Sequence, residues 1–99
     1  MYCLKLENKN LSNPKIYLEG RIDTVSTIEP ELNKILYDLR DSCEICINLD
    51  KIESISDNCL KMFQRFHKIY PLNFQGYSLY IETQLSEYQL LKLSPQISK

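Results

Sequence analysis

The sequence predicts a single α/β domain over residues 1–99, with a four-stranded mixed sheet and helices packed on one face. Four segments alternate apolar and polar side chains, which is typical of strands that bury one face. Three other segments carry apolar side chains at helical spacing. Strands of a doubly wound sheet are apolar on both faces, so the alternation predicts that the second face of this sheet is open to solvent.

The predicted element order is β-β-α-β-α-β-α. The expected strands are residues 2–7, 16–19, 45–50 and 77–82. A turn at residues 8–14 joins the first two, and right-handed crossovers make the second, third and fourth strands parallel. Tyr17 and Tyr80 then lie on the open face. The expected core consists of Ile16, Leu18, Leu32, Leu36, Ile45, Ile47, Leu49, Leu60, Phe63 and Leu79.

The apolar stripes and their boundary residues place three helices. They are predicted at residues 27–40, 57–70 and 84–93. Ser26 or Thr27 caps the first helix, and Pro30 is tolerated because it falls in the first turn. Ser56 or Asp57 caps the second.

Composition excludes several classes of function. The net charge is −1 and no basic patch stands out, so we do not expect nucleic acid as a partner. No apolar run approaches the roughly 20 residues that span a bilayer, so no membrane insertion is expected. The N-terminus lacks a signal peptide pattern, which favours a cytoplasmic protein. No catalytic triad, glycine-rich phosphate loop or paired carboxylate motif is present, so we predict neither an enzyme nor a cofactor.

Three of the four cysteines, together with the lone histidine, could supply a zinc site on paper. These residues are Cys43, Cys46, Cys59 and His67. If Cys43 and Cys46 both lie in the third strand, their odd separation puts them on opposite faces, where they cannot bind one ion. Without an export signal, disulfides are not expected either. We therefore predict free thiols and no metal.

Two local motifs resemble those of the STAS domain family, the anti-sigma-factor antagonists and their relatives. Gly20-Arg21-Ile22-Asp23 is similar to the family's G-x-[LI]-D. The segment from Asn48 to Leu60 is similar to its strand followed by an Asp-Ser-Ser-Gly-Leu turn, with matching spacing. The resemblance covers residues 2–94 and implies a STAS-like fold. Gly20 and Asp23 also have a structural interpretation, because Gly favours turns and Asp bonds to nearby backbone amides.

The second motif departs from the family pattern at the residues of its turn. Ser56 replaces the Asp, Asp57 and Asn58 replace the two serines, Cys59 replaces the Gly, and Leu60 is retained. In the family, a partner kinase that is itself the anti-sigma factor phosphorylates the second serine. Asn58 cannot be phosphorylated, so the resemblance implies partner binding without the usual switch.

The resemblance implies a small regulatory domain that binds a protein, in the family a histidine kinase-like ATPase anti-sigma factor. The expected contact residues are Ser54, Ser56, Asp57, Asn58, Cys59, Lys61, Gln64 and Arg65. An accessory STAS subunit of a membrane transporter is the alternative. A receiver-type phosphoacceptor at Asp50 is less favoured, because only Glu7 follows the first strand where receivers carry an acidic pair for Mg²⁺.

Overall fold

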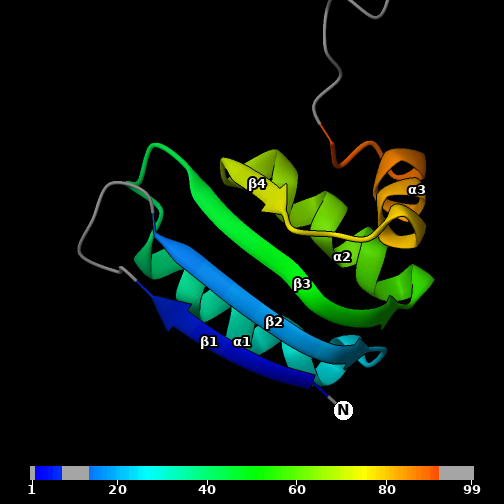
Figure 1. The fold of residues 1–99 in the computed structure, drawn as a ribbon. Helices are drawn as coiled ribbons and strands as arrows, with labels where there is room; N and C mark the ends of the chain where they lie inside the picture. Colours follow the sequence, from blue (N-terminus) through cyan, green and yellow to red (C-terminus); the bar gives the residue numbers. More distant parts are fainter. Residues whose placement is uncertain (1, 8–13, 92–99) are drawn as a thin grey trace, which may run out of the picture.

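The computed structural model describes residues 2–7 and 14–91 and contains the predicted succession of elements (Figure 1). The strands are β1 (Tyr2–Glu7), β2 (Lys15–Ile22), β3 (Ile45–Ile55) and β4 (Leu72–Gln75), and the helices are α1 (Val25–Asp38), α2 (Asp57–Ile69) and α3 (Leu79–Glu87). The predicted turn before Pro14, and residues 92–93 of the predicted third helix, lie outside the described residues. In the described part of the chain, no helix combines the length and apolar character needed to cross a membrane.

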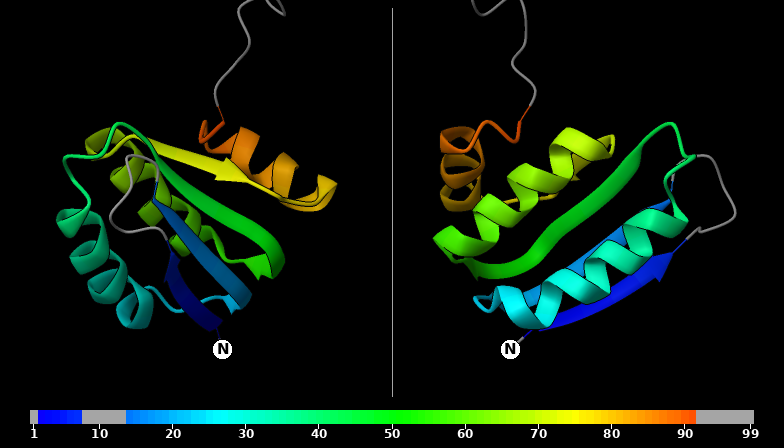
Figure 2. Two further views of the ribbon diagram at one scale, coloured as in Figure 1. Left: turned by 60° about the vertical axis from the view of Figure 1, so that its left-hand side comes forward. Right: turned by 180° about the vertical axis from the view of Figure 1, so that it is seen from behind.

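The four strands form one mixed sheet in the order β1-β2-β3-β4. β1 pairs antiparallel with β2, whereas β2, β3 and β4 are mutually parallel. The right-hand view of Figure 2 shows α1 and α2 side by side in front of the sheet, on one of its faces, with α3 at the side of α2. The mixed sheet and its element order confirm the predicted fold class and are consistent with a STAS-like arrangement.

The side of the sheet under the helices holds the core, in the register that the alternation predicts. Ile16, Leu18 and Ile47 are at most 1% exposed and belong to the buried cluster. Cys46 is also shielded, but it is not part of that cluster, because its side chain lies on the other face of β3. Every predicted core residue except Leu79 is buried.

β3 continues to Ile55, past the strand end predicted at Asp50. It has a bulge after Asn48 and a second after Ile52, each adding one residue relative to β2. A bulge sets two successive residues on the same side of a strand, so Leu49, Ile52 and Ile55 all reach the core despite a spacing of three. That spacing breaks strict alternation, which is why the sequence pattern predicted the end of the strand at Asp50.

The fourth strand predicted at residues 77–82 is wrong. β4 lies earlier, where Leu72 and Phe74 are buried, and residues 79–87 form α3 instead. Gly76, with φ +74°, lets the chain turn out of β4. Ser78 then caps α3, with its hydroxyl accepting the N–H of Ile81 at 3.3 Å.

This shift reverses the environment of two predicted strand residues. The alternation in residues 77–82 is too short to distinguish a strand from the start of a helix. In the structure, Ile81 and Leu85, one helical turn apart, face inward. Leu79, predicted to be core, is 81% exposed. Tyr80 is 61% exposed and lies on α3, not on the open face of the sheet.

The two long helices differ in how they begin. α2 is capped as predicted, because the Ser56 hydroxyl accepts the N–H of Cys59 at 3.3 Å. α1 starts before the predicted cap, and its N-cap Thr24 makes no side-chain capping bond. Pro30 is the sixth helical residue and not part of the first turn, so it removes the bond that this position would donate to the Ser26 carbonyl.

Candidate functional site

The two motif segments meet at the end of the sheet where the parallel strands β2 and β3 both finish. The backbone N–H of Ser56 donates to the carbonyl of Ile22 at 2.9 Å, which ties the two strand ends together. Asp23 follows one strand, and Asn58 lies in the first turn of the helix that follows the other. Both side chains line a hollow of about 410 Å³, completed by Thr24, Val25, Lys61 and Arg65. The sequence places these segments far apart, and the parallel pairing brings them together.

We call the charged and amide groups of this hollow, Asp23, Asn58, Lys61 and Arg65, the corner surface. All four residues are exposed. The hollow lies where both α1 and α2 begin, so the positive ends of two helix dipoles point toward it. Arg65 also pairs with Glu29 of α1 at 3.1 Å. The corner surface is therefore a polar recess of mixed charge.

Several predicted contact residues do not belong to this surface. Cys59 is fully buried, and burial raises the pKa of its thiol. Gln64 faces the segment that follows α3, where its Nε2 donates to the Tyr88 carbonyl at 2.9 Å. Desolvation and then the Asp57 carboxylate raise the pKa of Tyr88, so Asp57 also lies on the α3 side. The predicted set is thus divided between two sides of α2.

The hydroxyls near the corner surface and Gly20 belong to the strands and to the helix cap, whereas Asp23 does not make the backbone bonds considered for it. Ser56 is occupied as the cap of α2, and Ser54 is a half-buried residue of β3, not part of a loop. Gly20 has φ +89° within β2, opposite a bulged stretch of β3, so it lies in a strand and not in a turn. Asp23 accepts the Thr24 hydroxyl at 3.2 Å and shows no bond to the backbone amides of the following loop.

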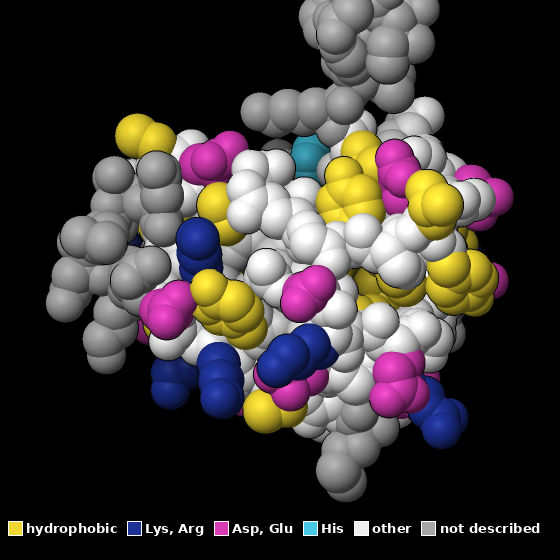
Figure 3. Space-filling view, in the orientation of Figure 1, with side chains coloured by type: hydrophobic (Ala, Val, Ile, Leu, Met, Phe, Trp, Pro, Cys, Tyr) yellow, Lys and Arg dark blue, Asp and Glu magenta, His cyan; other side chains and the backbone are white. Residues whose placement is uncertain are grey.

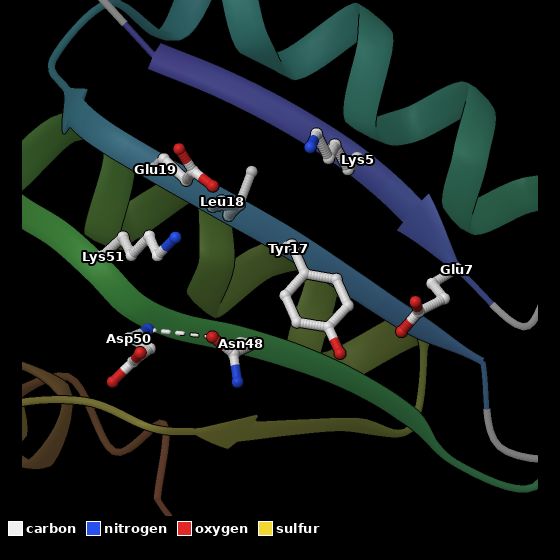
Figure 4. A pocket seen from close by; sticks show the side chains of 8 residues that line it. All are labelled: Lys5, Glu7, Tyr17, Leu18, Glu19, Asn48, Asp50 and Lys51. Atoms are coloured by element: carbon white, nitrogen blue, oxygen red, sulfur yellow. Dashed lines mark hydrogen bonds between the residues drawn. The ribbon is translucent and has the colours of Figure 1, made fainter.

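Sequence reasoning did not identify a second recess, of about 380 Å³, on the open face of the sheet (Figure 4). Its side chains come from β1, β2 and β3, and the charged and polar ones are Lys5, Glu7, Tyr17, Glu19, Asn48, Asp50 and Lys51. A hydrogen bond to Glu7 is the main cause that raises the pKa of Tyr17. The polar positions of the alternating strands could have located this recess.

The receiver-type alternative depended on Asp50 ending a strand. Asp50 instead lies inside β3, and its N–H donates to Asn48 Oδ1 at 3.0 Å. Within residues 2–7 and 14–91, no three His, Cys, Asp or Glu side chains are grouped for a metal ion. The opposite-face argument for the cysteines was wrong in one respect, because β3 starts at Ile45 and leaves Cys43 outside the strand. Cys43 is an exposed free thiol, and Cys46 is a buried one.

Comparison with known protein families gives no matching family model, and comparison with curated proteins gives no match. Membership of the STAS family therefore stays a prediction from the two motifs.

Proposed function

We propose that this chain is a small regulatory domain that binds a protein partner through the corner surface, in the manner of an anti-sigma-factor antagonist. The observation that carries the proposal is that Asp23 and Asn58, from the two family-like motifs, line one hollow. Lys61 and Arg65 extend that hollow along α2 and provide positive groups for an acidic contact. The partner that the resemblance implies is a histidine kinase-like ATPase domain of an anti-sigma factor.

Binding in this proposal is constitutive. Asn58 occupies the position of the phosphorylated serine and has no hydroxyl to modify. The neighbouring hydroxyl of Ser56 accepts the N–H of Cys59 as a helix cap. A phosphate at such a site would add about −1.5 to −2 charges and change partner affinity. Without it, the domain remains in the form that corresponds to the unmodified, binding-competent antagonist.

The test is titration calorimetry of the chain against the histidine kinase-like ATPase domains of its host. We expect a complex with one of them, and we expect Asn58→Asp to weaken it by roughly tenfold or more, because it adds a negative charge where the family's phosphate would lie. The melting temperature of Asn58→Asp should stay close to wild type, because anions are tolerated at a helix start.

Two lysines of α2 provide a matched control. Lys61 lines the hollow, whereas Lys68 is an exposed residue of the same helix outside it. Lys61→Glu should weaken the complex much more than Lys68→Glu. If both leave the affinity unchanged while Tyr17→Ala on the open face abolishes it, the binding site is the sheet and the proposal fails. Binding only to transporter subunits would favour the accessory-subunit alternative.

A further inference from the structure

A second surface, at the far end of the sheet from β1, has a different chemical character. Residues 77–91 contain two glutamates, Glu82 and Glu87, and the next lysine of the sequence is Lys92. Leu79 and Tyr80 are among the most exposed large apolar side chains of the described residues. In Figure 3, apolar and acidic side chains gather over α3, whereas Lys and Arg side chains lie over the lower part of the sheet.

A hollow of about 260 Å³ lies beside β4 on this surface. It is lined by Leu72, Asn73, Phe74, Tyr77, Leu90 and Leu91, with the exposed Glu82 as its acidic group. β4 is the last strand of the sheet and, among the described residues, pairs with β3 alone. A terminal strand offers backbone N–H and C=O groups along its outer edge to an added strand. The hollow therefore combines a strand edge, a lining of mixed polar and apolar groups, and one negative group.

The elements around this hollow are held firmly by contacts with the rest of the domain. Gln84 Nε2 donates to the Ile55 carbonyl at 3.2 Å, which joins α3 to the end of β3. Gln89 adopts a left-handed conformation, with φ 58°, and turns the chain back after α3. The N–H of Leu90 then donates to the Leu85 carbonyl at 2.9 Å, and Leu90 is 2% exposed. A site held in this way loses little conformational entropy on binding.

We propose that the hollow beside β4 binds an extended segment of a second partner protein, in which an apolar side chain is flanked by lysine or arginine. The segment lies along the outer edge of β4, which has no strand partner among the described residues, as in recognition by strand addition. Its apolar side chain enters between Tyr77 and Leu91, and its cation faces Glu82. This surface is separate from the corner surface and does not depend on the function proposed for it.

The test uses a random octapeptide display library selected against the full chain. Selected sequences should combine apolar residues with Lys or Arg. The tightest binder is synthesised together with a counterpart in which every Lys and Arg is Glu. Amide chemical shifts of the chain, recorded during titration, should change in β4 and residues 77–91. The acidic counterpart should not bind, and methylation of alternate peptide amides should abolish binding if a strand is added.

Two glutamates of α3 provide the matched control. Glu82 lines the hollow and Glu87 does not, although both are exposed. Glu82→Lys should lower peptide affinity by roughly tenfold, and Glu87→Lys by much less. The proposal is overturned by acidic binders, by equal effects of the two variants, or by binding that tolerates amide methylation. Shifts centred on the corner surface, or sedimentation showing that a second copy of the chain covers this hollow, would also overturn it.

Discussion

The last two βα units of the described part of the chain, β3–α2 and β4–α3, each combine a strand of the sheet with the helix that follows it, but they differ greatly in length. β3 and α2 have 11 and 13 residues, whereas β4 and α3 have 4 and 9. β4 pairs with β3 only from Ile45 to Asn48, so the rest of that side of β3 lacks a strand partner in the described structure. α3 lies there instead, and Gln84 satisfies the Ile55 carbonyl.

This difference shows that, where a terminal strand is short, a side chain can donate the hydrogen bond to a backbone carbonyl of the neighbouring strand that a longer strand would have donated. In the longer unit, α2 and the first half of β3 follow from apolar periodicity, because each buries a regular stripe, whereas the bulged second half of β3 does not. The shorter unit buries only Ile81 and Leu85 from its helix and leaves Leu79 in solvent. Because the shorter unit buries so little, an edge of β4 and the hollow beside it remain exposed. The longer unit instead contributes Asn58, Lys61 and Arg65 to the corner surface.

The largest expected effect is on the longer unit. Ile47 is 0% exposed near the start of β3, and Ile47→Ala should lower the free energy of unfolding by about 2–5 kcal/mol. Chemical denaturation of wild type and variant gives this value. A change below about 1 kcal/mol would mean that Ile47 is not in the core and that the register is wrong.

The same truncation at two positions of α3 tests the corrected assignment of the shorter unit. Leu85→Ala should cost about 2–3 kcal/mol, because Leu85 is 0% exposed. Leu79→Ala should change stability by no more than about 0.5 kcal/mol, because Leu79 is 81% exposed. Equal losses in urea unfolding would restore the discarded strand at residues 77–82.

The three helix starts should differ in their dependence on the cap. Ser56→Ala and Ser78→Ala each remove a hydroxyl that accepts a backbone N–H, and should cost about 1 kcal/mol. Thr24→Ala removes no capping bond and should cost less than either serine substitution. Thermal melts of the three variants rank them, and a large loss at Thr24 would contradict the cap geometry.

The smallest effect concerns pH. Desolvation, followed by the hydrogen bond from the Tyr2 hydroxyl to Glu31 at 2.6 Å, raises the pKa of Tyr2 to about 12. A raised pKa in the folded state means that the contribution is complete below pH 10 and is lost as the pH rises toward 12. The melting temperature should therefore fall over this range less steeply in Tyr2→Phe than in wild type. Parallel curves would show that Tyr2 does not contribute.

Sequence by itself determined the parts of this protein in which local pattern and burial agree. Alternation placed Ile16, Leu18 and Ile47 in the core, the polar residue before α2 predicted its cap, and the mixed sheet followed from element order. These features depend on neighbours along the chain. Their physical cause is that each element buries one face, and the apolar residues of that face lie within the element itself.

Tertiary structure decided the rest. The bulges of β3 depend on its pairing with β2. Residues 79–82 form the start of α3, next to the part of β3 that the short β4 leaves without a strand partner in the described structure. The corner surface exists because the strands are parallel neighbours, which brings Asp23 beside Asn58 and turns Gln64 away toward α3. These features arise from contacts between residues distant in sequence. A short stretch of sequence does not contain these contacts, so it cannot predict the features that depend on them.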